Sequence, residues 1–421
     1  MNARAPAAAT TRVILVLAAL HLLAFVDRTA LSGVLPLVRG EVAMNDAQAG
    51  WLIGTAFALP YAATALALAA IMRGRRASVG WLAGGVLAWT AAAIASAAAT
   101  SLVTLSLARA LLGVGQGVFV PLAVAWLIDQ AGEKRASALA TFASGATIGR
   151  SIALLLVGTL LWLLAIIFAR TNIAHWRWLL ALTAVPNLLI LPVLLRASPR
   201  AVSATPIGGE QATPWHALAA FFVVAIAPLI LAQAAGGWMP TLFVRQAGIT
   251  AAQAATLLGV VTLATGWVGQ SVCGWLLARR PALVAYLPLI VLIALAATLV
   301  PFALLTQART LPAMVVCVVA ANLMLGVSGF AGLFGVQALI PPAARASVNG
   351  IYFALVTLIA VGSGPLLAGL LAESGWSTAA ALLGTGVIAT LACAAAVAMS
   401  RVTFHAALRS SGGGIVPLAG R

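Results

Sequence analysis

The sequence contains few charged residues, and those it has are mostly of one sign. Charged residues make up 7% of the 421 residues, whereas a soluble globular protein carries about 25%. Only 7 residues are acidic against 23 basic ones, and Lys134 is the single lysine. Hydrophobic residues reach 63% and the mean hydropathy is +1.12. A soluble core cannot bury that much apolar surface, so the composition predicts an integral membrane protein.

Cysteine, histidine and the usual catalytic motifs are equally scarce. The three cysteines, Cys273, Cys317 and Cys393, lie inside apolar runs and have no disulfide or metal spacing. The chain lacks HExxH and GxSxG, and no helix carries two deep carboxylates. We therefore expect no enzymatic activity, no metal and no cofactor. The net charge of +16 comes from arginines scattered between apolar runs, which argues against a nucleic-acid partner.

Apolar runs long enough to cross a bilayer recur along the whole chain. The expected helices are 12–37, 49–72, 78–98, 102–128, 137–165, 177–196, 215–240, 251–278, 282–304, 311–340, 348–372 and 378–400. They predict an all-α membrane protein of twelve transmembrane helices in two pseudo-symmetric six-helix bundles. The expected domains are an N-terminal segment 1–11, a bundle 12–196, a linker 197–214, a bundle 215–400 and a tail 401–421.

The basic residues outside these helices indicate the orientation of the chain. Fifteen lie in the loops and termini of one side and five in the loops of the other. By the positive-inside rule, both termini and the linker are expected in the cytoplasm. The Ala- and Arg-rich composition suggests a bacterial inner membrane.

The two halves of the chain resemble each other in sequence. RAS occurs at 135–137 and at 345–347, and LGV occurs at 112–114 and at 325–327. Internal repeats of this kind, with a site near the membrane midplane, are typical of secondary transporters.

Four charged residues fall deep inside the expected helices, away from their ends: Asp27, Arg28, Arg109 and Arg150. A charge at the centre of a bilayer costs at least about 2.5 kcal/mol, so such residues face the protein interior or a wet cavity. Three arginines against one aspartate leave an excess of positive charge, which a negatively charged substrate would balance. This excess is the main argument for an anionic ligand.

Three of the candidate residues have a structural interpretation as well as a functional one. Arg109 either takes part in coupling or holds its helix to the first helix through Asp27. Arg150 either binds an anion through two hydrogen bonds or bonds backbone carbonyls. His21 is either a proton participant or a packed side chain. We expect Asp27, the one deep carboxylate, to couple transport to protons, with Arg109 and His21. The expected substrate-binding residues are Arg28, Arg150, Gln116, Tyr61, Gln233, Trp238, Asn349 and Tyr352.

Several segments resemble the major facilitator superfamily. FVDRTALSGVLPLV at 25–38 and AGWLIGTAFALPYA at 49–62 are similar to the first helices of Spinster-type transporters and of anion:cation symporters. LARALLGVGQGVFVP at 107–121 is similar to the fourth-helix motif. The resemblance implies two bundles that move by alternating access. The gating residues expected from it are Arg73, Arg75, Arg76, Gly113, Gly117, Arg135, Arg345 and Pro365.

The sequence departs from the family pattern at three positions. Ile71 and Ala278 stand where the superfamily places an acidic residue before its basic clusters, which puts the usual charge locks between the halves in doubt. Gln116 stands where related symporters often have Glu, and an amide cannot titrate.

The expected function is secondary transport of a small organic anion, a carboxylate or a sugar acid, coupled to protons through Asp27. The alternatives are a Spinster-type exporter of lysolipid-like amphiphiles and a non-transporting receptor or channel on the same fold. The expected partners are the anion, the proton and the lipid bilayer, and we expect a monomer.

Overall fold

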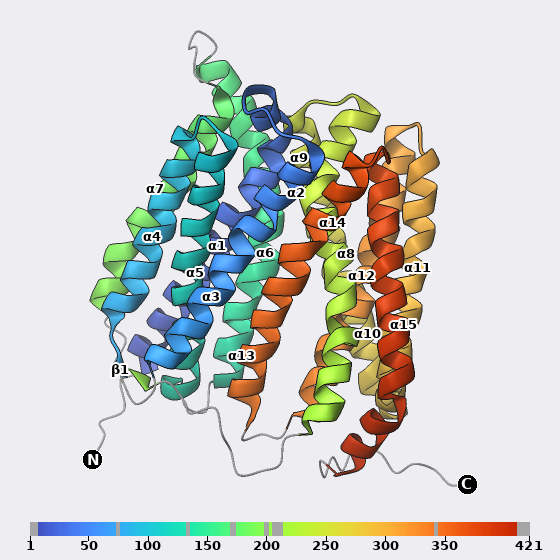
Figure 1. Ribbon diagram of the computed structural model, residues 1–421. Coiled ribbons are helices and arrows are strands. Elements are labelled where there is room, and N and C mark those ends of the chain that lie inside the picture. Colours follow the sequence, from blue (N-terminus) through green and yellow to red (C-terminus); the bar gives the residue numbers. More distant parts are fainter. Residues whose placement is uncertain are drawn as a thin grey trace. The chain divides into compact units, whose positions relative to one another are not determined.

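The computed structural model describes residues 7–72, 76–131, 135–168, 174–197, 202–203, 214–340 and 344–410, which are almost entirely helical (Figure 1). The first elements are α1 (Ala7–Glu41), α2 (Asp46–Ile53), α3 (Thr55–Ile71), β1 (Arg76–Ala77), α4 (Val79–Ala98), α5 (Leu102–Gln130), α6 (Arg135–Ile167), α7 (His175–Ala197) and β2 (Val202–Ser203). The remaining helices are α8 (Trp215–Ala247), α9 (Ala251–Thr265), α10 (Val268–Arg279), α11 (Leu287–Gln307), α12 (Leu311–Leu339), α13 (Arg345–Leu355), α14 (Gly362–Glu373) and α15 (Thr378–Ser410).

Within the described ranges, twelve helical segments are long and apolar enough to cross a membrane, which confirms the predicted fold class. Some segments consist of more than one element. The second span joins α2 and α3 around Gly54, and the eighth joins α9 and α10 around Gly266. A 3₁₀ turn, Pro281–Tyr286, precedes α11, and a π-helical turn, Val356–Val361, joins α13 to α14. Such π-helical turns are frequent at functional sites.

Two helices extend well beyond their predicted ends. The seventh run was expected to stop at residue 240, but α8 continues through Pro240 to Ala247. Pro240 removes the backbone hydrogen bond to the carbonyl of Gly236, four residues earlier, yet the helix continues to Ala247. The last helix, expected to stop at 400, continues to Ser410.

Contacts group the chain into two compact units. The first comprises residues 1–206 and 239–260, and the second comprises residues 207–238 and 261–421. The end of α8 and the start of α9 thus pack with the first unit. A short antiparallel pair, β1 with β2, joins Arg76 to Ser203 and Ala77 to Val202.

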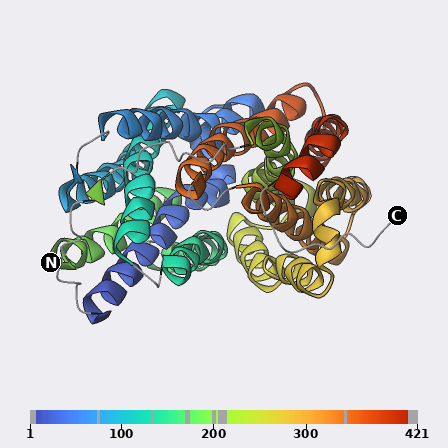
Figure 2. The ribbon, with the colours of Figure 1, turned by 90° about the horizontal axis from the view of Figure 1, so that it is seen from below.

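In the first unit, α1 lies beside α6 and α7, and α5 lies beside α3 and α4 (Figure 2). Glycine allows the close approach of α5 to α3. A β-carbon at Gly113 would lie 2.3 Å from the Phe57 carbonyl oxygen, and one at Gly117 would lie 2.7 Å from that of Tyr61. Small residues permit such backbone contact between membrane helices. Gly113 and Gly117 therefore set the distance between α5 and α3.

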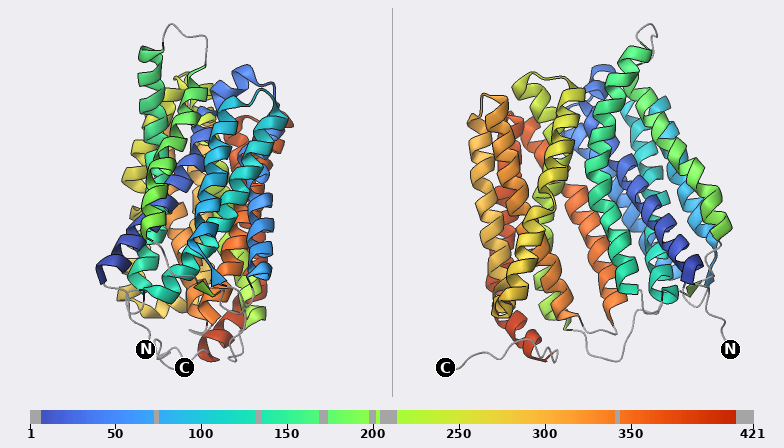
Figure 3. Two further views of the ribbon diagram at one scale, coloured as in Figure 1. Left: turned by 90° about the vertical axis from the view of Figure 1, so that its left-hand side faces the viewer. Right: turned by 180° about the vertical axis from the view of Figure 1, so that it is seen from behind.

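In the second unit, α11 packs against α12 and α15, and α12 also packs against α10 (Figure 3). Trp238 is fully buried, and its indole Nε1–H donates to the Pro365 carbonyl oxygen at 2.9 Å. Pro365 follows the π-helical turn, so this bond joins α8 to α14 where α14 begins.

Candidate functional site

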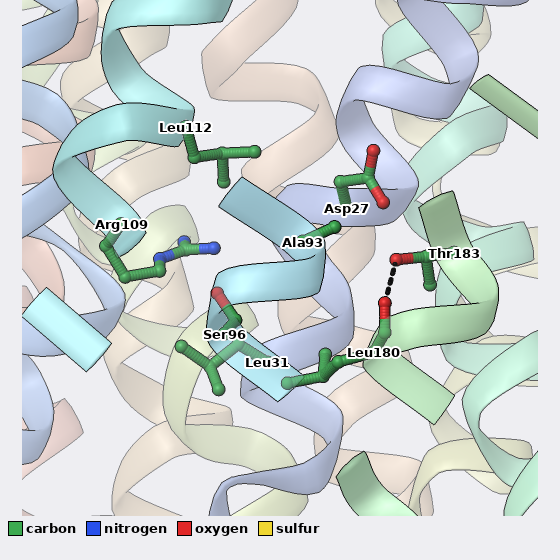
Figure 4. A pocket seen from close by; sticks show the side chains of 8 residues that line it. All are labelled: Asp27, Leu31, Ala93, Ser96, Arg109, Leu112, Leu180 and Thr183. Carbon is green, nitrogen blue, oxygen red and sulfur yellow. Dashed lines mark hydrogen bonds between the residues drawn. The ribbon is translucent and has the colours of Figure 1, made fainter. Parts of the chain in front are cut away.

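Asp27 and Arg109 line a small pocket inside the first unit (Figure 4). The pocket is formed by α1, α4, α5 and α7, and has room for about one water molecule. Its lining residues are Asp27, Leu31, Ala93, Ser96, Arg109, Leu112, Leu180 and Thr183. Both charged side chains are buried, with exposed fractions of 6% for Asp27 and 2% for Arg109.

The Asp27 carboxylate is held by an amide from α7. Asn187 is fully buried, and its Nδ2–H donates to Asp27 Oδ2 at 2.8 Å. The other carboxylate oxygen, Oδ1, accepts no hydrogen bond in the described part of the chain. The Ser96 and Thr183 hydroxyls donate to backbone carbonyls of their own helices. Asp27 therefore has one fixed oxygen and one that is open to a proton or a donor.

Arg109 connects α5 to α1 through the backbone. Its Nη2 donates to the Arg28 carbonyl oxygen at 3.3 Å. Among the described residues it forms no ion pair with Asp27, although both line the pocket. The sequence left two alternatives for Arg109: a part in coupling, or a contact with Asp27 that holds its helix to the first helix. The contact between the helices runs through the Arg28 carbonyl instead.

Arg28 points away from Asp27, into a cluster of aromatic rings. Its guanidinium carbon lies 4.5 Å from the centre of the Phe25 ring and 4.2 Å from that of Phe57. The Tyr61 ring lies farther away, at 5.9 Å. Its Nη2 donates to Gln116 Oε1 at 2.9 Å. The cation is thus held by cation–π contacts and one neutral acceptor.

Arg150, on α6, shares one of these rings. Its side chain is exposed, and its guanidinium carbon lies 5.4 Å from the centre of the Phe25 ring. Arg28, which belongs to α1, and Arg150, which belongs to α6, therefore lie close to the same ring. Neither pairs with a carboxylate among the described residues. Two cations thus share a ring and lack a carboxylate partner among the described residues, which leaves an excess of positive charge there.

His21 is packed between neighbouring helices. Its ring stacks on Phe142 with the centroids 4.0 Å apart, and Nδ1–H donates to the Phe142 carbonyl oxygen at 2.7 Å. The side chain is buried. These contacts match the packed alternative that the sequence left open.

The predicted residues of the second unit make local contacts there. Tyr352 is buried and packs against Phe222. Asn349 Oδ1 accepts from Gln337 Nε2 at 2.6 Å, and Gln233 is half-buried. Together with Trp238, these residues are uncharged amides and aromatic rings.

The structure describes only some of the predicted gating residues. Arg73 and Arg75 lie outside the described residues. Arg76 belongs to β1, while Arg135 and Arg345 begin α6 and α13, but their side chains are not among those described.

A charge cluster joins the ends of three helices in the first unit. Asp46 begins α2 and pairs with Arg39 at the end of α1. Arg245, near the end of α8, donates to the same carboxylate at 2.6 and 3.0 Å. This cluster ties the end of α8 to α1 and α2.

Sequence reasoning missed four residues that shape the candidate site. Asn187 is an amide within an apolar run, and this rare feature could have identified it. Phe25 precedes Arg28 by three residues, which places both on one helix face. Phe57 and Asp46 carry no such signal, because their contacts depend on how separate helices pack.

Comparisons with known proteins agree with this architecture. Residues 17–360 match the Major Facilitator Superfamily. A bacterial homologue of the human lysosomal transporter Spinster, inward-facing and occupied, is 21% identical with a TM-score of 0.74, covering 95% of this chain and 96% of that one. The nucleoside transporter NupG is 14% identical with a TM-score of 0.69, covering 92% and 98%.

A D-xylose–proton symporter is 15% identical with a TM-score of 0.66, covering 91% of this chain and 96% of that one. No curated protein matches. At these identities the three solved structures share the fold alone. The family match covers most of the chain, and with the twelve apolar helices it indicates a multi-pass integral membrane protein. The chain belongs to the Major Facilitator Superfamily.

Proposed function

We propose that the protein is a secondary active transporter that carries a small organic anion by alternating access. The observation that carries this proposal is the pair Arg28 and Arg150, which share the Phe25 ring and have no carboxylate partner in the described structure. Uncompensated cations within membrane spans are costly. A carboxylate or sugar acid would bind a planar guanidinium through two hydrogen bonds and remove that cost.

Coupling to protons is assigned to Asp27. This carboxylate is buried, has one oxygen without a hydrogen-bond partner and lies in the pocket with Arg109. Protonation would remove its charge, so the balance between Asp27 and the surrounding arginines would change during the cycle. The proposed location is a bacterial inner membrane, with both termini in the cytoplasm.

A transport assay tests this proposal. Purified protein in liposomes should take up labelled carboxylates when a pH gradient is imposed. Asp27→Asn should abolish pH-driven uptake and leave exchange of internal for external substrate, because the neutral amide keeps the shape of the site without titrating. Uptake by the variant that still follows the pH gradient would refute the coupling role.

A lysolipid-like amphiphile is the second candidate substrate. The Phe25 and Phe57 rings beside Arg28 supply apolar surface next to a cation, which suits an anionic head attached to a chain. Competition between lysolipids and short carboxylates in the same liposomes separates the two candidates. Conductance that ignores substrate, or binding without flux, would instead indicate a channel or a receptor.

A further inference from the structure

Four charged side chains lie in the middle of the spans of the first unit, and they divide into two pairs. Asp27 and Arg109 line one pocket and are close in space and opposite in charge. Arg28 and Arg150 form the other pair, on the Phe25 ring. The first pair is balanced in charge, whereas the second carries two uncompensated positive charges.

The two guanidinium groups are near enough for one small ligand. Their carbons lie 4.5 and 5.4 Å from the centre of the same Phe25 ring, so they cannot be farther apart than the sum of those distances. A short dicarboxylate or a phosphate monoester has both charges within such a span.

Gln116 orients Arg28 without neutralising it. The amide is fully buried and fixed at both ends, because Nε2–H donates to the Ala24 carbonyl oxygen at 2.9 Å. Oε1 must then face Arg28, from which it accepts a hydrogen bond at 2.9 Å. A carboxylate at this position would cancel the charge of Arg28. The amide holds the same geometry and leaves the charge available.

The remaining donors of Arg28 also favour an anion. The Phe25 and Phe57 rings contact the guanidinium, whose hydrogen-bond donors lie along its edges. Its Nε–H is buried and has no hydrogen-bond partner within the described ranges. An anion beside that edge would supply an acceptor as well as a charge.

We propose that the substrate is a dianion, with one negative charge beside Arg28 and the other beside Arg150, and that the uncharged side chain of Gln116 preserves this preference by leaving the charge of Arg28 available. The proposal rests on the proposed anion transport and specifies the charge of the substrate. A monoanion would leave one guanidinium uncompensated within the spans, whereas a dianion balances both.

The test compares each dianion with a probe that lacks one or both of its negative charges. Isothermal titration of the purified protein would use succinate against succinamate and adipate against adipamate, which differ by one charge, and glycerol 3-phosphate against glycerol, which differ by two. Each dianion should bind at least about tenfold more tightly than its partner, as expected for one added charge-assisted contact. Arg150→Gln should remove the preference, so that each acid and its monoamide bind with similar affinity.

Two substitutions of Gln116 test its role. Gln116→Glu should weaken dianion binding at least about tenfold and remove the preference, because the new carboxylate neutralises Arg28. Gln116→Leu adds no charge, so it should keep the preference with weaker overall affinity. Arg150→Gln changes an exposed side chain and stays informative if a substitution at the buried Gln116 prevents folding.

The two proposals fail in different ways. Equal affinity for each acid and its monoamide in the unmodified protein would overturn the dianion proposal and leave an anion transporter. Binding of none of the acids, monoamides or phosphate would overturn both. A preference that survives Gln116→Glu would overturn the role of Gln116.

Discussion

At the scale of single residues, we expect the substitution of Asn187 to have a large effect on the surroundings of Asp27. Asn187→Leu keeps a similar volume but removes the amide that donates to the carboxylate at 2.8 Å. Losing a buried hydrogen bond to a charged group should lower the free energy of unfolding by about 1.5–3 kcal/mol. Thermal unfolding in detergent measures this change.

A double-mutant cycle separates that bond from general packing. In an Asp27→Asn background, Asn187→Leu should cost less, because the charged acceptor is already gone. The matched control is Asn322→Leu. Asn322 is half-buried on α12 and donates a hydrogen bond to the Thr265 hydroxyl. If the cost of Asn187→Leu is the same in both backgrounds, its contact with Asp27 contributes nothing.

At the scale of elements, glycine positions determine how closely helices approach. Gly113→Ala should destabilise the protein by about 1–3 kcal/mol, because its methyl group would meet the Phe57 carbonyl oxygen of α3. Gly84→Ala, on the exposed side of α4 with open space around it, is the control. It should be neutral or slightly stabilising, since alanine is the better helix former. Similar melting temperatures for the two variants would contradict this account of the packing.

The end of α8 is a second element whose position depends on few contacts. Asp46→Ala removes the carboxylate that binds Arg245 and Arg39. Amide hydrogen exchange over residues 239–247 should then increase, because that stretch loses its charged anchor to α2. The control Glu41→Ala breaks the ion pair with Arg177 on α7 and should leave these residues unchanged. Unchanged exchange in Asp46→Ala would show that apolar packing alone holds the end of α8.

The sequence predicted these elements well where periodicity or composition was decisive. The RAS repeats begin α6 and α13, and the LGV repeats place Gly113 and Gly326 where α5 meets α3 and α12 meets α10. Helix ends were less predictable, because the apolar run was expected to end at residue 240, whereas α8 continues to Ala247. The apolar run is a local feature of the sequence, whereas the continuation of a helix also depends on the packing of the residues beyond it.

At the scale of the whole molecule, the fold followed from apolar runs, but the candidate site followed only in part. Sequence reasoning identified Asp27, Arg28, Arg109 and Arg150, because charges inside spans are rare. It could not tell which charges would lie together. That depends on the rotation of α1, which turns Asp27 toward α7 and Arg28 toward α3.

The central claim is that uncompensated arginines in the membrane spans bind an anion. The most direct measurement is a thermal-shift screen of purified protein against carboxylates, phosphate esters and lysolipids, with neutral and cationic compounds in parallel. Ligands that bind the folded state raise the melting temperature by mass action. The account predicts that only anions raise it and that Arg28→Gln with Arg150→Gln abolishes the effect. Stabilisation by neutral or cationic compounds, without stabilisation by any anion, would contradict it.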